Sequence, residues 1–325
     1  MEKRILGKEL LVSAVGYGCM GLSHASGAPT ERKEAVKILR EAYDIGYTFF
    51  DTAECYTGEY PDGTISYNEE LVGEAFRDRR DKVVIASKYG VKHGGDHLIL
   101  DSSKETIRKS VEGSLKKLQT DVIDLYYQHR IDPKVSPEEV AEVMKELIKE
   151  GKIRYWGISE TNEEYLRRAH AVCPVTAIEN RYSMMARWHE NLFSVVEELQ
   201  IGYVAFSPMA NGFLSGKYNE NSSFDKKSDF RAHMPQYTGE GIKQNQELLE
   251  LLYHMAKEKQ ATSAQISMAW IMCKKPWIVP IPGSRKLDRM KENAGAADIK
   301  LTEAEIKELD EILEKIPMSK VFGGH

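Results

Sequence analysis

The chain has 325 residues, of which 42% are hydrophobic and 29% are charged, so it has the composition of an ordinary globular protein with a large core. Its formal net charge of -5, with both signs interspersed, offers no basic face for a nucleic acid. The start, MEKRILGKELLV, has no apolar run long enough for export, and no later stretch approaches membrane-spanning length. These features predict a cytoplasmic protein without nucleic-acid or membrane partners.

The first part of the chain reads as a hairpin followed by a glycine motif. KRIL, a GK turn and ELLVS predict the hairpin over residues 3–13. GYGCMG, residues 16–21, then matches G-x-G-x-x-G, a pattern that holds a dinucleotide only where a strand enters it and a helix starts at the third glycine. Gly27 and Pro29 break any helix there. A tight turn at a strand end is therefore favoured over a Rossmann loop.

Eight short apolar runs alternate with longer amphipathic stretches along the rest of the chain. The predicted strands are residues 14–18, 47–52, 82–88, 121–129, 155–159, 175–180, 203–208 and 277–283. The predicted helices are residues 30–45, 68–76, 103–118, 136–150, 161–171, 191–200, 263–273 and 286–296. Several begin with Ser, Thr or Asn, and SPEE and TNEE place acids in the first turn, where the helix dipole favours them.

Runs that are apolar at nearly every position are typical of parallel strands covered by helices. Eight such units in one chain of this length predict an α/β fold, a (β/α)8 TIM barrel with an N-terminal β-hairpin and extra helices, rather than an open doubly wound sheet. No linker divides the chain, so residues 1–325 are predicted to form a single domain. The polar stretch within residues 209–241 is typical of a mobile lid, and residues 242–259 and 302–316 predict two additional helices.

The cysteines and two histidines give no strong metal signal. Free thiols are predicted because no C-x-x-C pair is present among the four cysteines, Cys19, Cys55, Cys173 and Cys273. His93 and His97 have the spacing of metal ligands, with Asp96 between them. The two glycines of KHGGDH favour a flexible, solvated loop over a metal site.

Polar side chains end three of the predicted strands. Asp51, Lys88 and His129 finish strands two, three and four, and Tyr56 follows Asp51 by five residues. Barrel enzymes draw catalytic residues from the carboxyl ends of strands, although any one of these four could be structural. A buried lysine needs a partner, and Asp51 is the obvious one. We expect the lysine to lower the pKa of Tyr56 so that the phenol acts as an acid, with His129 orienting a carbonyl oxygen.

DTAECY, ASK, YYQHR and IPGSRKLDRMKEN closely resemble the aldo-keto reductase family, and the resemblance runs from LLVSAVGYGCMGLS to AADIKLT. It implies a TIM-type barrel that uses NADPH to reduce aldehydes or ketones to alcohols. It also implies a catalytic tetrad of Asp51, Tyr56, Lys88 and His129. In that family Tyr is the general acid, Lys lowers its pKa, Asp holds Lys, and His positions the substrate carbonyl.

The resemblance also implies the cofactor contacts. The nicotinamide half would contact Gly18, Cys19, Met20, Asp51, Ser159 and Glu179, and the pyrophosphate side Ser207, Pro208, Met209, Gly212 and Lys217. Glu292 and Asn293 would hold the adenine. Independently of the family, Gly283 and Ser284 precede a helix start that favours an anion, and Arg285 and Arg289 suit the 2′-phosphate of NADPH. The alternative for this last stretch is a solvated basic helix face.

Two positions depart from the common family pattern. Glu160 stands where many members have Asn, and Glu179 where a Gln that bonds the carboxamide is usual. A carboxylate cannot donate to the amide carbonyl, a task that Ser159 or Asn180 could take. We hypothesise that an ionised Glu179 favours NADP+ over NADPH and makes the cofactor a stronger hydride donor. The alternative is that Glu179 points elsewhere.

Two other functions stay open on the sequence alone. One is a redox-sensing regulatory subunit that binds NADPH with little turnover, against which the intact tetrad argues. The other is a metal-dependent hydrolase, for which only His129 and Asp51 could be ligands, and Lys88 would repel a cation. The sequence predicts neither the substrate nor the oligomeric state. Candidate substrate-wall residues are Tyr89, His93, Arg130, Trp188 and the long insertion at residues 209–241.

Overall fold

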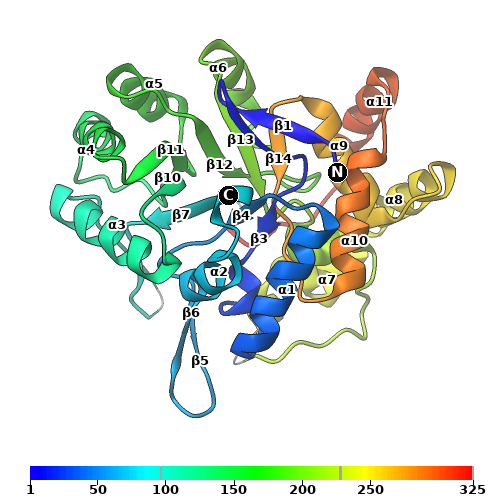
Figure 1. The fold of residues 1–325 in the computed structure, drawn as a ribbon. Helices are drawn as coiled ribbons and strands as arrows, with labels where there is room; N and C mark the ends of the chain where they lie inside the picture. The colour runs from blue at the N-terminus through cyan, green and yellow to red at the C-terminus, as the bar shows by residue number, and fades with distance from the viewer. Residues whose placement is uncertain (96, 227–228, 324–325) are drawn as a thin grey trace.

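The computed structural model describes residues 1–95, 97–226 and 229–323. Within them, eight parallel strands form one sheet with the neighbour order β3, β4, β7, β10, β11, β12, β13, β14. Their bounds are Tyr17–Gly18 (β3), Phe49–Asp51 (β4), Val84–Tyr89 (β7), Ile123–Gln128 (β10), Ile153–Ser159 (β11), Ala177–Arg181 (β12), Gly202–Phe206 (β13) and Ile278–Pro280 (β14). Figure 1 shows the strands at the centre with the helices outside them. All eight predicted strands are confirmed.

The sheet closes between its first and last strands. The backbone N–H of Gly16 donates to the carbonyl of Pro280 at 2.9 Å, and that of Gly18 donates to Pro282 at 3.2 Å. The two prolines have no N–H, so these bonds at the seam run in one direction only. A β-carbon on Gly18 would lie 2.7 Å from the carbonyl oxygen of Ile281, so close packing at the seam requires glycine there. The closed ring confirms the barrel.

Eight helices follow the strands at nearly the predicted positions. They are α1 (Arg32–Ile45), α2 (Asn68–Phe76), α3 (Lys104–Leu118), α4 (Pro137–Lys149), α5 (Glu163–Val172), α6 (Phe193–Glu198), α9 (Ser263–Lys274) and α10 (Leu287–Gly295). The expected caps are present. The side chains of Ser103, Ser136, Asn162 and Thr262 each accept a hydrogen bond from a backbone N–H in the first turn of α3, α4, α5 and α9.

The N-terminal hairpin, β1 (Lys3–Leu6) with β2 (Leu10–Ser13), covers the amino-terminal end of the barrel. Leu6, Leu10 and Val12 are buried in one cluster with the inward residues Phe49 and Val204. A β-carbon on Gly202 would lie 2.6 Å from the Leu6 side chain, so the hairpin packs closely against the start of β13. The inner layer at this end is therefore apolar and filled.

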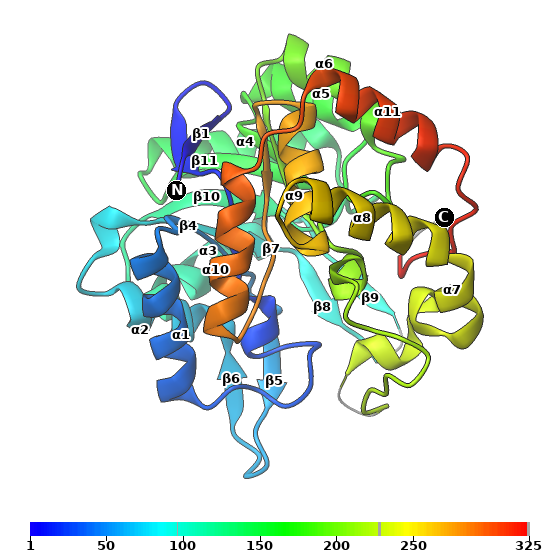
Figure 2. The same ribbon diagram turned by 90° about the vertical axis from the view of Figure 1, so that its right-hand side faces the viewer.

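The predicted helix over residues 242–259 is instead two helices, α7 (Gly239–Gln244) and α8 (Gln246–Glu258), which meet at Asn245. The buried side chain of Asn245 donates to the hydroxyl of Ser319 at 2.7 Å and accepts from its backbone N–H at 2.9 Å. This exchange ties the break to the C-terminal segment. Figure 2 shows α7, α8 and the C-terminal helix α11 (Glu303–Leu313) beside the barrel.

The loops at the carboxyl ends of the strands contain more structure than the sequence predicts. β8 (Val91–His93) pairs antiparallel with β9 (Leu98–Leu100), so Lys92 and His93 of the predicted loop lie in a strand; Gly94, Gly95 and His97 lie between the strands, and Asp96 lies outside the described residues. A second hairpin joins β5 (Thr57–Glu59) to β6 (Ile65–Tyr67). Short 3-10 turns are η1 (Met20–Leu22), η2 (Arg80–Lys82), η3 (Glu190–Leu192), η4 (Ala210–Ser215), η5 (Phe230–His233), η6 (Pro235–Tyr237) and η7 (Ala296–Asp298).

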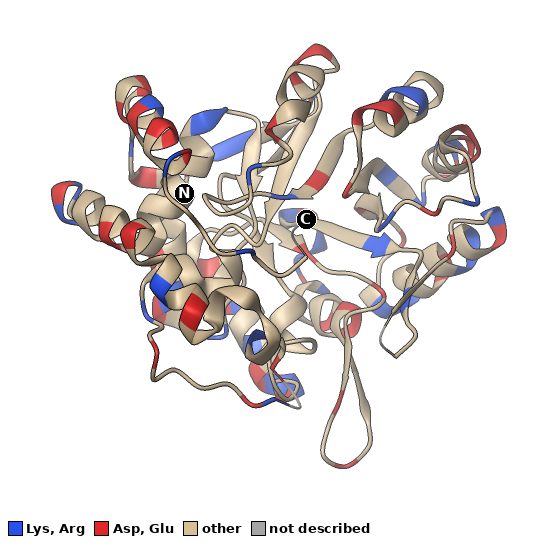
Figure 3. Cartoon of the chain, turned by 180° about the vertical axis from the view of Figure 1, so that it is seen from behind, with Lys and Arg blue, Asp and Glu red and all other residues tan. Residues whose placement is uncertain are grey.

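Both signs of charge alternate on the outer helices, as Figure 3 shows from behind. Many of these charges are paired between neighbouring helices; Arg32 of α1, for example, lies 3.0 Å from Glu70 and 2.6 Å from Glu74 of α2. In the described parts of the chain, no helix combines the length and apolar character needed to cross a lipid bilayer.

Candidate active site

Side chains at every second position of the strands point into the barrel and form its inner layers. Phe49, Ala86, Tyr127 and Ala177 belong to the apolar inner cluster. Two residues further along the same strands stand Asp51, Lys88, His129 and Glu179. The period of two therefore brings the three strand-end residues predicted from the sequence, together with Glu179, to the carboxyl-terminal end of one barrel interior.

Lys88 is fully buried between two carboxyl groups. Its ammonium pairs with Asp51, donates to the carbonyl of Thr52 at 3.0 Å, and lies 3.2 Å from Oε1 of Glu179. Burial acts to lower the pKa of Lys88, but the charges of Asp51 and Glu179 outweigh it, so the net pKa lies above its usual value. Lys88 is an ammonium at any physiological pH.

Tyr56 reaches this cluster from the loop between β4 and β5. Its ring centroid lies 5.2 Å from Nζ of Lys88 and 5.8 Å from the ring of His129, which meets it edge to face. Burial raises the pKa of Tyr56, and the opposing effect of Lys88 is smaller. The prediction of a lowered pKa is therefore wrong for the net shift, although Lys88 acts in the expected direction. The phenol holds its proton at neutral pH, which is the state a general acid needs.

His129 is held neutral. Burial, then the positive charges of Arg130 and Lys88, places its pKa well below the usual value. Its Nδ1 lies 3.5 Å from Sγ of Cys55. Burial raises the pKa of the Cys55 thiol to about 12. A thiol that stays protonated beside a neutral imidazole forms a weak hydrogen bond. Sequence reasoning missed Cys55, which no motif marks beyond its place in DTAECY.

Glu179 is buried, with 3% of its surface exposed, and points to Lys88; its contact with the nicotinamide stays a prediction. Burial, then the neighbouring Asp51, raises the pKa of Glu179 to about 8. At pH 7 this carboxyl is therefore mostly protonated. The ionised form that we hypothesised to act on the cofactor becomes the major form only above about pH 8.

The other residues predicted on the nicotinamide side are held by protein partners. The hydroxyl of Ser159 accepts from Arg130 at 3.1 Å. Glu160 accepts the backbone N–H of Arg181 at 2.8 Å and lies 3.7 Å from His189. Cys19 is fully buried, and burial raises the pKa of its thiol well above the usual value, so it packs as an inert side chain.

The phosphate end predicted from the sequence gathers two cations around one carboxylate. Nζ of Lys217 lies 3.6 Å from Glu292, and Arg289 binds the same oxygen at 2.6 Å. Arg285 instead donates to the carbonyls of Gly21 and Ser26, so its guanidinium braces the loop after β3. A surplus of positive charge at the start of the nine-residue helix α10 fits a polyanionic group such as a dinucleotide phosphate.

Backbone strain marks the segment after β13. Ser207, Ala210 and Asn211 have φ values of 51°, 46° and 60°, in the left-handed region that disfavours residues other than glycine, and Glu160 after β11 has 52°. Such strained residues persist where the surroundings impose them, and they cluster at functional sites. Ser207 and the glycine after Asn211, Gly212, are among the predicted pyrophosphate contacts, which include Pro208 and Met209.

The candidate substrate wall differs from the predicted one. Tyr89 is fully buried against Tyr126 at 5.3 Å and is a core residue. His93 is exposed on β8 and lies 4.8 Å from the ring of His24, which in turn stacks 6.0 Å from Tyr56. Phe230 approaches His24 at 6.4 Å from the long loop after β13. The sequence offered no signal for His24, whose place near Tyr56 arises only from the folded loops, whereas Phe230 belongs to the long insertion that was a candidate wall as a whole.

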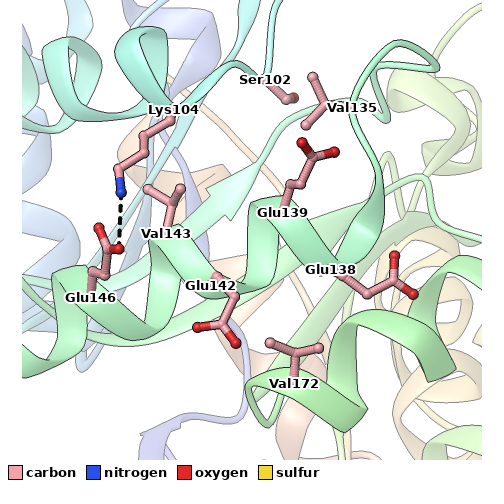
Figure 4. A pocket seen from close by; sticks show the side chains of 9 residues that line it. All are labelled: Ser102, Lys104, Val135, Glu138, Glu139, Glu142, Val143, Glu146 and Val172. Carbon is pink, nitrogen blue, oxygen red and sulfur yellow. Dashed lines mark hydrogen bonds and ion pairs between the residues drawn. The ribbon is translucent and has the colours of Figure 1, made fainter.

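A surface hollow lies away from this cluster, on the outer side of α3, α4 and α5 (Figure 4). Four glutamates line it, and three are already paired, Glu146 with Lys104, Glu138 with Arg168 and Glu142 with Lys145. It contains no nucleophile beside a base. Among the described residues, no group of three or more His, Cys, Asp or Glu side chains is arranged to hold a metal ion.

Comparison with known proteins gives one consistent family. A model of the aldo/keto reductase family matches residues 14–314. A probable aldo-keto reductase from Glycine max is 38% identical over 316 residues, 96% of this chain and 88% of that protein. A glycerol dehydrogenase structure from Gluconobacter oxydans has a TM-score of 0.85 and 26% identity, covering 97% of this chain and 95% of its own. An aldo/keto reductase structure from Klebsiella pneumoniae, in complex with NADP and acetate, has a TM-score of 0.72 and 27% identity. The match covers 98% of this chain and 96% of that one.

Proposed function

Because this chain belongs to the aldo/keto reductase family, we propose that it reduces aldehydes or ketones to alcohols with NADPH, with Tyr56 as the general acid. The observation that carries the proposal is the packing of a protonated phenol, a buried ammonium and a neutral imidazole at one end of the barrel interior. A structural neighbour of 27% identity was solved with NADP, which supports the choice of cofactor.

NADPH, when bound, supplies the hydride that reduces the carbonyl carbon. Lys217 and Arg289 would hold its phosphate end beside the start of α10, and Ser159 with Glu179 would lie on the nicotinamide side. The residues present fit a phosphate because two cations, Lys217 and Arg289, share the single carboxylate of Glu292. The group therefore keeps a net positive charge that a phosphate can pair with.

The tetrad then handles the proton. A neutral His129 can donate from a ring nitrogen to the carbonyl oxygen and hold it beside the phenol. Tyr56 gives its proton to that oxygen as the alcohol forms, and the ammonium of Lys88 stabilises the phenolate that remains. Asp51 keeps Lys88 in place by the ion pair that offsets its burial. Because Lys88 and Asp51 are buried away from solvent, the interaction between this ammonium and the phenolate is stronger than it would be in water.

The test is NADPH oxidation with 4-nitrobenzaldehyde, followed for wild type, Tyr56→Phe and the control Tyr67→Phe on the exposed β6 strand. We expect Tyr56→Phe to lower kcat by about 100- to 10,000-fold while NADPH binding, measured by fluorescence titration, persists. Tyr67→Phe should retain wild-type turnover. Tight NADPH binding by wild type without turnover of any aldehyde, ketone or quinone would instead indicate a redox-sensing protein.

A further inference from the structure

Two arginines meet over one aromatic ring at the mouth of the barrel. Arg181 ends β12 two residues after Glu179, so it belongs to the same inward-pointing row of side chains. Its guanidinium carbon lies 5.0 Å from the ring centroid of Phe206, the residue beside it at the end of β13. The guanidinium carbon of Arg130, which directly follows His129, lies 5.9 Å from the same centroid.

Among the described residues, the buried Arg181 guanidinium has no counter-ion within ion-pair distance, and Gly323 of the C-terminal segment lies against it, since a β-carbon there would be 3.3 Å from Nη2. The residue is only 8% exposed, and its buried Nη1 has no hydrogen-bond partner. In the ranges that the structure describes, no carboxylate lies within ion-pair distance of either guanidinium. Such a charge is unfavourable unless something pairs with it. Burial, opposed in part by Glu160 but reinforced by Arg130, lowers the pKa of Arg181.

The charged groups around this pair do not neutralise it. Nη1 of Arg130 donates to the carbonyl of His129 at 2.6 Å and to Ser159 at 3.1 Å. Glu160, the nearest acid, accepts the backbone N–H of Arg181 and faces His189 at 3.7 Å. Deeper in the barrel, Asp51 and Glu179 both lie against Lys88. The mouth therefore carries a surplus of positive charge beside the imidazole proposed to position the carbonyl.

We propose that Arg181, together with Arg130, binds the carboxylate of an anionic carbonyl substrate, so that the enzyme prefers oxo-acids to neutral aldehydes and ketones. The inference rests on the proposed function, since it names the substrate class of that site. The unpartnered Nη1 of Arg181 can donate to one carboxylate oxygen, and Arg130 on the same Phe206 ring can contribute a second charged donor. The cofactor phosphates have their own cations in Lys217 and Arg289, so this pair is left for the substrate.

The experiment compares 3- and 4-carboxybenzaldehyde with their methyl esters, which keep the shape of the acid but lose its charge. The ratio of kcat/KM for acid to that for ester is measured for wild type, Arg181→Met and Arg181→Lys. Arg154→Met is the matched control, because Arg154 lies on β11 toward the opposite end of the barrel and pairs with Asp124. NADPH affinity is measured for every variant by fluorescence titration.

We expect Arg181→Met to lower the acid-to-ester ratio by about 10- to 100-fold, the size of a lost hydrogen bond to a charged group. The acid-to-ester ratio of Arg181→Lys should lie between those of wild type and Arg181→Met, and the ratio of Arg154→Met should match that of wild type. An unchanged ratio in Arg181→Met would overturn the proposal. So would an equal loss for acid, ester and NADPH affinity, which would assign Arg181 to the cofactor.

If wild type turns over neither acid nor ester, nor 4-nitrobenzaldehyde or any other aldehyde, ketone or quinone, the proposed function fails; whenever acid and ester are not turned over, calorimetric binding of 4-carboxybenzoate decides this inference separately. Binding that is lost in Arg181→Met supports the anion site, and equal binding by the two proteins refutes it.

Discussion

Replacing Glu179 with Gln removes one ionisable group from the buried cluster around Lys88 while keeping its shape. Two carboxyls face a single ammonium there, and Oε1 of Glu179 lies 3.2 Å from Nζ. At that distance an effective dielectric constant of ~20 makes the attraction between ionised Glu179 and Lys88 worth ~5 kcal/mol. Burial, together with the repulsion from Asp51, exceeds this attraction, because the pKa of Glu179 is raised from 4.5 to about 8.

The raised pKa fixes the sign of the stability change with pH. The folded chain binds a proton at Glu179 between pH 4.5 and about 8 that the unfolded chain has already lost, so the contribution of Glu179 to folding stability is greatest below pH 4.5 and falls through this window. The linkage relation sets the whole loss at ~5 kcal/mol. Gln cannot ionise. We therefore expect Glu179→Gln to gain about 2 to 5 kcal/mol relative to wild type between pH 5 and pH 9.

Urea unfolding at pH steps from 5 to 9, followed by fluorescence and near-ultraviolet circular dichroism, measures this difference. Coincident curves from the two probes establish that the transition is two-state. Glu160→Gln is the matched control: burial raises the pKa of Glu160, but the hydrogen bond from the Arg181 backbone N–H and the nearby His189, 3.7 Å away, outweigh it, so the net pKa is lowered and the stabilising contribution of Glu160 is lost as the pH falls into the acid range. Parallel pH dependence in wild type and Glu179→Gln would refute the reasoning.

Three further predictions follow from single contacts. Between pH 6.5 and 9.5, ionisation of Glu179 should shift relative affinity toward NADP+ over NADPH by about 3- to 10-fold in fluorescence titrations. Gly157→Ala should destabilise the fold by about 1 to 3 kcal/mol in urea, since its β-carbon would lie 2.4 Å from the carbonyl oxygen of Ala177. Cys55→Val should lower kcat by about 2- to 10-fold, because the thiol that lies 3.5 Å from Nδ1 of His129 would be lost.

Each of these has its own control. The cofactor ratio should stay flat with pH in Glu179→Gln, and an equal drift in both proteins would assign it to another group. Gly239→Ala should be tolerated, because no atom lies within 4 Å of a β-carbon there; equal losses for both glycines would contradict the steric argument. Cys55→Ser, which keeps a donor, should restore the turnover that Cys55→Val loses, and failure to do so would leave only a packing role.

Local patterns were enough to predict the barrel. Strand and helix positions depend on periods of two and 3.6 residues and on capping side chains, all of which act within a few residues of sequence. Asp51, Lys88 and His129 could be placed together for the same reason, because parallel strands present their carboxyl ends on one side. The break at Asn245 escaped prediction, since its cause is a contact with Ser319, 74 residues away.

The sequence by itself determined which residue types end each strand, and therefore that a lysine, a carboxylate and an imidazole would share one end of the barrel. Only the tertiary structure decided their charge states. The high pKa of Tyr56, the protonation of Glu179 and the unpartnered Nη1 of Arg181 all depend on burial and on neighbours from other parts of the chain. Desolvation and Coulomb interactions act through space, so they exist only once distant segments have packed together.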